Sequence, residues 1–369
     1  MKAEQISILL PVHNGARHLR HTLQSVLAQT DPDWELIVVD DASTDDTAAI
    51  VRELQDTRIR LLSNPRNEHI CHSLNIALAA AQGRWIARID ADDFWYPEKL
   101  SLQRAYLEAH EDCGACFTYV DVVDEQDRPL GENESWFVRH FHVENQPTPE
   151  AWQKLLLTEG CRLCHPSVLL RREAMGEGYD PALVQVQDFE LWLRVARRWR
   201  LHVLPTVLMA YRASEDSVSA RSAAVDRRSD YEMGLMIARY VDEMPPECFR
   251  EVFGLRVPEA ANRLDFACEK AFALLERTIR APFYRSRALD RFAALLHTPE
   301  GMARLREKYG FRPVDFYRLS SEDAANGEQW LTAVEALPAH VLIKASAKKL
   351  LRKLGLLQSA KKLIRGSGQ

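Results

Sequence analysis

Several features that would assign a chain to a special class of protein are missing from this sequence. No apolar run is long enough to cross a lipid bilayer, and the first residues lack the layout of a signal peptide. Internal repeats and low-complexity segments are absent as well. The net charge of −5 excludes a molecule that attracts nucleic acid over its whole surface, so we expect no nucleic-acid partner.

The cysteines are odd in number, with seven in 369 residues. Without an export signal, this usage predicts free thiols in a reducing cytoplasm. Cys113 with Cys116, and Cys161 with Cys164, have the spacing of a four-thiolate zinc site. The first pair lies in a predicted strand, however, where residues three apart point to opposite faces. We therefore favour small, core-filling thiols over a structural zinc.

The first half of the chain alternates short apolar runs with helical patterns. Strands are predicted at Ile6–Val12, Glu35–Asp40, Ile59–Ser63 and Arg84–Asp90. A helical pattern follows each of the first three strands, and Ser, Thr and Asp residues supply caps for the second helix. Near-continuous apolar strands that alternate with helices predict an α/β fold, in which a mostly parallel sheet carries helices on both faces.

The sequence predicts three parts. Residues 1–215 form the α/β domain, and residues 216–343 form a helical region rich in Ala, Leu, Arg and Glu. The last part, residues 344–369, contains eight Lys or Arg residues and no acid between Lys344 and Arg365. Its apolar residues fall on one helical face. Such a helix either lies on an anionic membrane surface or packs its leucines on the helical region.

Acidic clusters follow two of the predicted strands. Asp40 and Asp41 close the second strand, and Asp90, Asp92 and Asp93 close the fourth. Ligands bind at the carboxyl ends of the strands in an open α/β sheet, so we expect both clusters to face one crevice. All-oxygen ligands select a hard cation such as Mg²⁺ or Mn²⁺. The alternative is that the last two acids only cap the following helix, and the residues alone leave both interpretations open.

Five segments that occur in order resemble family 2 glycosyltransferases with the GT-A fold. They are ISILLPVHNG, ELIVVDDASTDDT, GRWIARIDADD, HPSVLLRR and QDFELWLR. Together they extend over roughly residues 4–215, and several separated motifs make the resemblance specific. The chain is most similar to bacterial enzymes that build surface polysaccharide or lipopolysaccharide.

The resemblance assigns nucleotide-sugar binding to the first two strand ends. Pro11 and Val12 match the segment that lines the nucleotide base, and Asn14 lies in the loop that follows. Asp41 matches the acid that accepts a hydrogen bond from the uracil ring, with Asp40 beside it. The resemblance therefore implies a nucleotide sugar as donor, with UDP as the nucleotide.

The resemblance also assigns the metal and the catalytic base. Asp92 and Asp93 match the ribose- and metal-binding acids, with Asp93 as the metal ligand and Asp92 next to it toward the ribose. Asp188 matches the base of the inverting enzymes, and Gln187 stands where the family commonly has Glu. The base would take the proton of the acceptor hydroxyl, and Mn²⁺ or Mg²⁺ would neutralise the diphosphate leaving group.

The expected acceptor or donor pocket adjoins Asp188 and includes His165, Gln187 and Trp192. His165 either contacts substrate or is a satisfied buried imidazole, and both interpretations stay open. We expect Asp188 to precede an amphipathic helix that carries Trp192, so that amides at the helix end keep the carboxylate ionised.

The resemblance implies an inverting, metal-dependent glycosyltransferase at the inner face of the plasma membrane. It would transfer a sugar to a glycan or lipid-linked acceptor in cell-surface polysaccharide synthesis. Because lipid-linked acceptors are common in this family, we favour peripheral membrane contact for residues 344–366. One alternative is a sugar-phosphate nucleotidyltransferase, but PVHNGARHL lacks the Gly-rich, Arg-containing phosphate loop of that class. The other is a degenerate glycan-binding module, which would have lost acids that this chain retains.

Overall fold

A computed structural model describes the chain over residues 2–131, 135, 137–213, 222–260, 262–277 and 283–321. The chain divides into two compact units, Met1–Met236 and Ile237–Gln369. The boundaries expected at residues 215 and 343 stay predictions. The basic tail, residues 344–369, lies outside the described residues, and so does the membrane contact predicted for residues 344–366.

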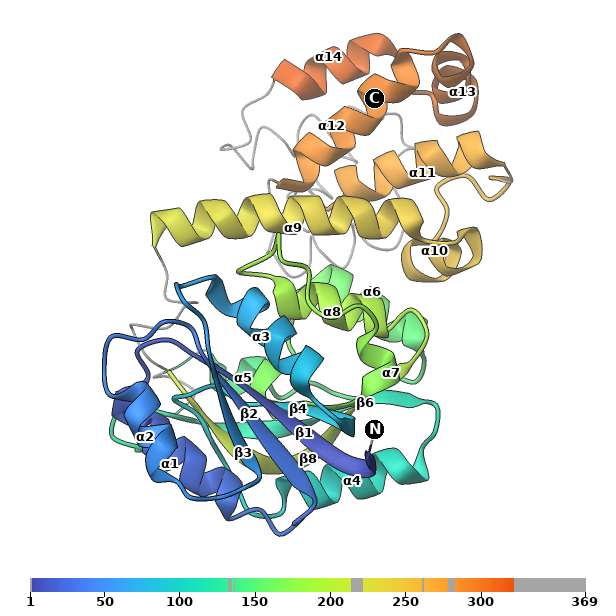
Figure 1. Ribbon diagram of the computed structural model, residues 1–369. Helices are drawn as coiled ribbons and strands as arrows, with labels where there is room; N and C mark the ends of the chain where they lie inside the picture. The colour runs from blue at the N-terminus through green and yellow to red at the C-terminus, as the bar shows by residue number, and fades with distance from the viewer. Residues whose placement is uncertain are drawn as a thin grey trace. The chain divides into compact units, whose positions relative to one another are not determined.

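The first unit is built on one mixed sheet (Figure 1). Within the described residues this sheet has eight strands in the order β3-β2-β1-β4-β7-β6-β8-β5. β1 pairs in parallel with β2 and β4, β2 pairs in parallel with β3, and β7 is antiparallel to β4 and β6. The predicted α/β architecture is confirmed. The strands are β1 (Lys2–Val12), β2 (Trp34–Asp40), β3 (Ile59–Ser63), β4 (Gly83–Arg88), β5 (Phe94–Trp95), β6 (Cys113–Val123), β7 (Leu169–Arg171) and β8 (Arg200–Arg212).

Helices cover both faces of this sheet. Leu19 and Leu23 of α1 share one buried cluster with Leu100 and Leu107 of α4. Figure 1 shows α3, which packs against β1 and β2, on the opposite face. The helices of this unit are α1 (Ala16–Leu27), α2 (Thr47–Glu53), α3 (His69–Ala80), α4 (Lys99–Ala109), α5 (Phe137–His140), α6 (Pro149–Glu159), the 3₁₀ turn η1 (His165–Ser167), α7 (Arg172–Met175) and α8 (Gln187–Val195).

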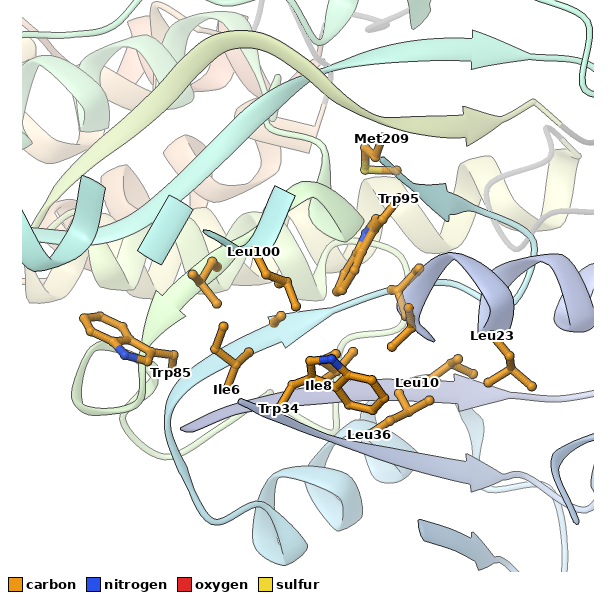
Figure 2. Packing of buried hydrophobic residues seen from close by; sticks show 14 of the residues in the cluster. Ile6, Ile8, Leu10, Leu23, Trp34, Leu36, Trp85, Trp95, Leu100 and Met209 are labelled. Carbon is orange, nitrogen blue, oxygen red and sulfur yellow. The ribbon is translucent and has the colours of Figure 1, made fainter. Parts of the chain in front are cut away.

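Every second residue of β1 points into the main core. Ile6, Ile8 and Leu10 are fully buried and cluster with Leu36 of β2 and Leu23 of α1, as Figure 2 shows. Because side chains alternate along a strand, the residues between them face the side that carries α3. A strand buried on both faces needs the nearly continuous apolar run that the sequence has there.

The second unit is helical, as predicted for the C-terminal region. Its core is aromatic: the ring of Phe272 lies 4.9 Å from that of Phe292 and 5.5 Å from that of Tyr309, and Phe292 stacks on Phe311 at 4.4 Å. In the part of the chain that the structure describes, none of the helices combines the length and apolar character needed to cross a membrane. After α9 (Ala223–Glu243), which continues from the first unit, the helices are α10 (Pro246–Phe253), α11 (Arg263–Leu275), α12 (Phe283–Leu296), α13 (Pro299–Tyr309) and α14 (Pro313–Ser321).

Leu10→Ala should lower the free energy of unfolding by about 2–5 kcal/mol, because it leaves a cavity where a fully buried side chain supports the main core. Leu102 on α4 is 42% exposed, and Leu102→Ala should cost less than about 0.5 kcal/mol. Urea unfolding followed by circular dichroism measures both. Similar losses in the two variants would show that β1 is not the centre of the core.

Candidate functional site

Parallel pairing brings the ends of β1, β2 and β4 to one edge of the sheet. Val12 pairs with Asp40, the last residue of β2, and Leu9 pairs with Arg88, the last residue of β4. The chain leaves all three strands at this edge, which is where open α/β sheets bind ligands. β4 ends at Arg88 rather than at Asp90 as predicted, so the acids that follow belong to a loop.

Asp41 is buried directly after β2. Its N–H donates to the carbonyl of Val12 at 2.8 Å. Its Oδ1 accepts hydrogen bonds from Nδ2 of Asn64 at 2.6 Å and from the N–H of Glu68 at 3.0 Å. The N–H of Asn64 in turn donates to the carbonyl of Asp40 at 2.8 Å. The Asp41 carboxylate is therefore fixed by residues that follow the neighbouring strand β3.

Asn14 ties the loop after β1 to the loop after β2. Its φ of 53° is positive, a conformation that asparagine adopts more readily than most residues. Its N–H donates to Oγ of Ser43, and its Oδ1 accepts from the N–H of Thr44, both at 2.8 Å. Pro11 and Val12 end β1 just before this loop and are buried. The predicted nucleotide-binding residues of the first two strands thus lie together.

Asp90, Asp92 and Asp93 form a compact cluster after β4. Each offers a carboxylate oxygen, and these oxygens all lie within 4.8 Å of one another. Arg88 binds Asp90 through both terminal nitrogens, with Nη1 2.6 Å from Oδ2. The guanidinium is buried, so this paired geometry is protected from water.

Arg212 holds the same cluster from the end of β8. Its N–H donates to Oδ1 of Asp93 at 2.8 Å, and its Nε donates to the carbonyl of Asp92 at 2.8 Å. Its Nη1 reaches the carbonyl of Asp124 at 2.6 Å, and Nη2 pairs with Asp127. One buried side chain therefore connects the acid loop with the turn after β6.

The acid cluster is short of positive charge. Burial raises the pKa of Asp93 well above its usual range, and the charges of Asp92 and Asp90 raise it further. Burial, followed by the charge of Asp90, raises the pKa of Asp92 to about 6. Oδ2 of Asp93 is buried and has no hydrogen-bond partner among the described residues. A buried carboxylate oxygen beside two further acids fits a hard divalent cation such as Mg²⁺ or Mn²⁺.

Asp188 lies inside the first turn of α8, whereas the sequence analysis placed it before the helix. Its Oδ1 accepts a hydrogen bond from the N–H of Phe189 at 2.8 Å, and Sγ of Cys161 lies 3.8 Å from its Oδ2. Burial raises the pKa of Asp188, while the Phe189 N–H and the charge of Arg88 oppose that rise. The charge of Arg88 also acts on Asp93, so Arg88 connects the acid cluster with Asp188 electrostatically.

The three residues expected in the acceptor or donor pocket are all buried. His165 shares a hydrogen bond of 2.8 Å with the hydroxyl of Tyr179, and burial together with the charge of Arg88 lowers the pKa of His165 well below its usual value. It is therefore a neutral imidazole. The ring of Trp192 packs 5.5 Å from that of His165. Gln187 precedes Asp188, and its buried Oε1 accepts no hydrogen bond from any residue that the structure describes.

Three residues that matter to this geometry were missed in the sequence analysis. Arg88 had a readable signal, because a basic residue two positions before an acid at a strand end is well placed to pair with it. Asn64 had a weaker one, as a polar residue directly after the third predicted strand. Arg212 had none, because its contact with Asp93 joins positions 119 residues apart.

Comparison with known proteins gives consistent matches. The family model described as Glycosyl transferase family 2 matches residues 7–175. The putative glycosyltransferase EpsE of Bacillus subtilis is 30% identical over 226 residues, which cover 59% of this chain and 76% of EpsE. The UDP-Glc:alpha-D-GlcNAc-diphosphoundecaprenol beta-1,3-glucosyltransferase WfgD of Escherichia coli is 28% identical over 226 residues, which cover 58% of this chain and 79% of WfgD.

A solved structure is similar over more of the chain. The crystal structure of S. aureus TarS 1-349 in complex with UDP-GlcNAc matches with a TM-score of 0.59. The match covers 90% of this chain and 91% of the TarS chain. The sequence identity is 17%, so this likeness is one of fold.

Arg88→Met should lower the free energy of unfolding by about 2–4 kcal/mol, because the acid cluster loses its buried counter-ion. Adding Asp90→Asn should restore part of that loss, since it removes one uncompensated charge. A double-mutant cycle in urea without divalent cations measures this coupling. Arg20→Met is the matched control. It breaks an exposed pair with Glu53 and should cost less than about 1 kcal/mol. Equal losses of unfolding free energy in the two arginine variants would contradict the role of Arg88 as the counter-ion of the acid cluster.

Proposed function

The chain belongs to glycosyl transferase family 2, and from this premise we propose that it is an inverting enzyme that uses a UDP-sugar and a divalent cation. It is a glycosyltransferase of the bacterial surface-polysaccharide type, and its GT-A fold agrees with the sequence analysis. A sugar-phosphate nucleotidyltransferase is therefore no longer an alternative.

The observation that carries the proposal is the unpartnered oxygen of Asp93. Among the described residues nothing donates to Oδ2, although burial makes an isolated carboxylate oxygen costly. We infer that Asp93, with Asp92 beside it, holds Mn²⁺ or Mg²⁺. When bound, the cation neutralises the charge that develops on the diphosphate leaving group. Arg88 keeps Asp90 paired, and the Arg212 N–H orients Asp93.

The nucleotide would lie along the ends of β1 and β2. Asp41 is oriented by Asn64 and the Glu68 N–H, so its carboxylate is preorganised to accept a hydrogen bond from a uracil ring. Pro11 and Val12 would line the base. Asn14 joins the two loops, and Asp40 accepts the N–H of Ser43 within the second loop. UDP is supported by the UDP-Glc in the name of WfgD and by the UDP-GlcNAc bound to TarS.

Asp188 would act as the general base. It would take the proton of the acceptor hydroxyl while that oxygen attacks the anomeric carbon and the bond from that carbon to the diphosphate breaks. Burial raises the pKa of the carboxylate and makes it a stronger base, and the Phe189 N–H and the charge of Arg88 oppose that rise. Opposing influences of this kind are typical of a catalytic acid or base.

The acceptor would bind next to Asp188. Oε1 of Gln187, which has no partner among the described residues, would accept from a donor on the acceptor sugar, and Trp192 and the neutral His165 would support the wall behind it. A lipid-linked acceptor is supported by the diphosphoundecaprenol in the name of WfgD. Such an acceptor would place the enzyme at a membrane surface, where residues 344–366 are the proposed contact.

Asp93→Ala should abolish the Mn²⁺-dependent stabilisation of the protein by a UDP-sugar. For the unaltered chain that stabilisation is about 2.7 kcal/mol at a donor concentration 100 times Kd, and it appears as a rise in Tm. A panel of nucleotide sugars with and without Mn²⁺ measures it. Asp112→Ala, at a side chain 66% exposed, should leave the effect intact. An Asp93→Ala variant with the full Mn²⁺-dependent rise would remove the metal assignment.

Asp188→Asn should lower kcat by about 10²–10⁴-fold while donor affinity changes little, because the amide keeps the shape but cannot take a proton. Single-turnover assays with a UDP-sugar and calorimetric binding measure the two effects. Glu190→Gln in the same helical turn alters a residue paired with Arg194 and should retain activity. A fully active Asp188→Asn variant would refute the base. Donor binding without turnover in the unaltered chain would favour a glycan-binding module.

A further inference from the structure

The thiol of Cys161 lies against Asp188 and has no role in the proposed reaction. Cys161 is half-buried in the loop after α6, and its Sγ is 3.8 Å from Oδ2 of Asp188. The other oxygen, Oδ1, accepts the N–H of Phe189 at 2.8 Å. The two oxygens of this carboxylate therefore have different partners, one from its own helix and one from a loop 27 residues earlier.

The loop that carries Cys161 is anchored on both sides of the thiol. The carbonyl of Cys161 accepts a hydrogen bond from Nε2 of His140 at 2.7 Å. The next residue, Arg162, donates from Nε to the carbonyl of His140 and from Nη2 to that of Arg139, both at 3.2 Å. Gly160 turns the chain after α6 with a φ of 86°. These contacts hold the backbone of Cys161 in place, and from there its Sγ reaches Oδ2 of Asp188.

The protonation state of Cys161 sets the direction of the contact. Burial, and then the charge of Asp188, raise the pKa of the Cys161 thiol well above its usual value. The sulfur therefore keeps its proton throughout the neutral range. The sulfur has two acceptors within reach, the carbonyl of Leu163 at 3.7 Å and Oδ2 of Asp188 at 3.8 Å. The charged carboxylate is the stronger acceptor, so we direct the S–H to Oδ2 of Asp188.

The other titratable groups near Asp188 come from several elements. Arg88 at the end of β4 supplies positive charge, which it shares with Asp90. The charge of Asp188 also acts on Cys71 of α3 and on Tyr179 after α7. Burial is the main influence and raises the pKa of both groups, so they are uncharged at neutral pH. Within the part of the chain that the structure describes, the hydrogen bonds to the carboxylate come from the Phe189 N–H and the Cys161 S–H.

We propose that Cys161 is a positioning residue for the general base, because its S–H holds Oδ2 of Asp188 in the orientation that takes the proton from the acceptor hydroxyl. This inference rests on the proposed function, in which Asp188 is the base. The thiol forms no covalent bond in the reaction. The proton moves from the acceptor oxygen to Asp188, and the sulfur keeps its own proton.

The pH dependence of kcat at saturating donor and Mn²⁺ tests this role. Loss of the S–H in Cys161→Ala destabilises the ionised carboxylate, so the pKa of Asp188 rises. The acidic limb of the profile should move to higher pH by about half a unit, a threefold change in proton affinity. Cys161→Ser supplies a stronger O–H donor, so its acidic limb should lie at or below the original pH.

A matched control separates this effect from the loss of any buried thiol. Cys113 in β6 is buried, and its sulfur lies 3.3 Å from the carbonyl of Ala115 rather than from a carboxylate. Cys113→Ala should leave the acidic limb in place. The proposal would be overturned if the acidic limb of Cys161→Ala did not move. It would also be overturned if the limb of Cys161→Ser moved to higher pH as far as that of Cys161→Ala. If the Ala variant does not fold, the Ser variant decides: its limb must not move to higher pH.

The failures of the two proposals are distinguishable. An active Asp188→Asn variant would overturn the general base, and the role of Cys161 with it. An inactive Asp188→Asn variant, together with an unmoved limb in Cys161→Ala, would overturn only the role of Cys161.

Discussion

The buried guanidinium of Arg88 is the interaction on which the candidate site depends. It is paired with Asp90, and its charge also acts on Asp93 and Asp188. Carboxylates as crowded as these repel one another, and burial adds to the cost of their charge. One cation from the last residue of β4 offsets part of that cost at both halves of the site. The part of the cost that Arg88 does not offset appears as the raised pKa of Asp93. Its Oδ2 also has no partner among the described residues, and both features favour a divalent cation.

The parallel sheet explains why these groups meet. Each of β1, β2 and β4 delivers its next residues to the same edge, and the register pairs Val12 with Asp40. Backbone and side-chain hydrogen bonds then lock the loops together, as Asn64 does for Asp41 and Asn14 does for Thr44. The continuous apolar core beneath, in which Ile8 and Leu36 are fully buried, supports that edge. A well-packed edge lets polar groups be preorganised for a ligand before it arrives.

Several groups near Asp188 stay uncharged at neutral pH. Cys161 is a thiol, and burial keeps the hydroxyl of Tyr179, which is hydrogen-bonded to the neutral His165, protonated. The carboxylate is therefore tuned by two local donors and by the more distant Arg88, rather than by a direct ion pair. This arrangement fits a base better than a salt bridge would, because a directly paired carboxylate binds a proton poorly.

The sequence by itself determined the α/β architecture, the helical C-terminal region and the grouping of acids after the fourth strand. Apolar runs, caps and the motif around Asp90, Asp92 and Asp93 are local patterns, so they can be recognised without knowledge of the tertiary contacts. Only the tertiary structure decided how those acids are held. Arg212 reaches Asp93 from 119 residues away, and Cys161 reaches Asp188 through a loop anchored by His140. Such contacts join distant parts of the chain and leave no periodic signal, because they depend on how strands and loops are placed in space.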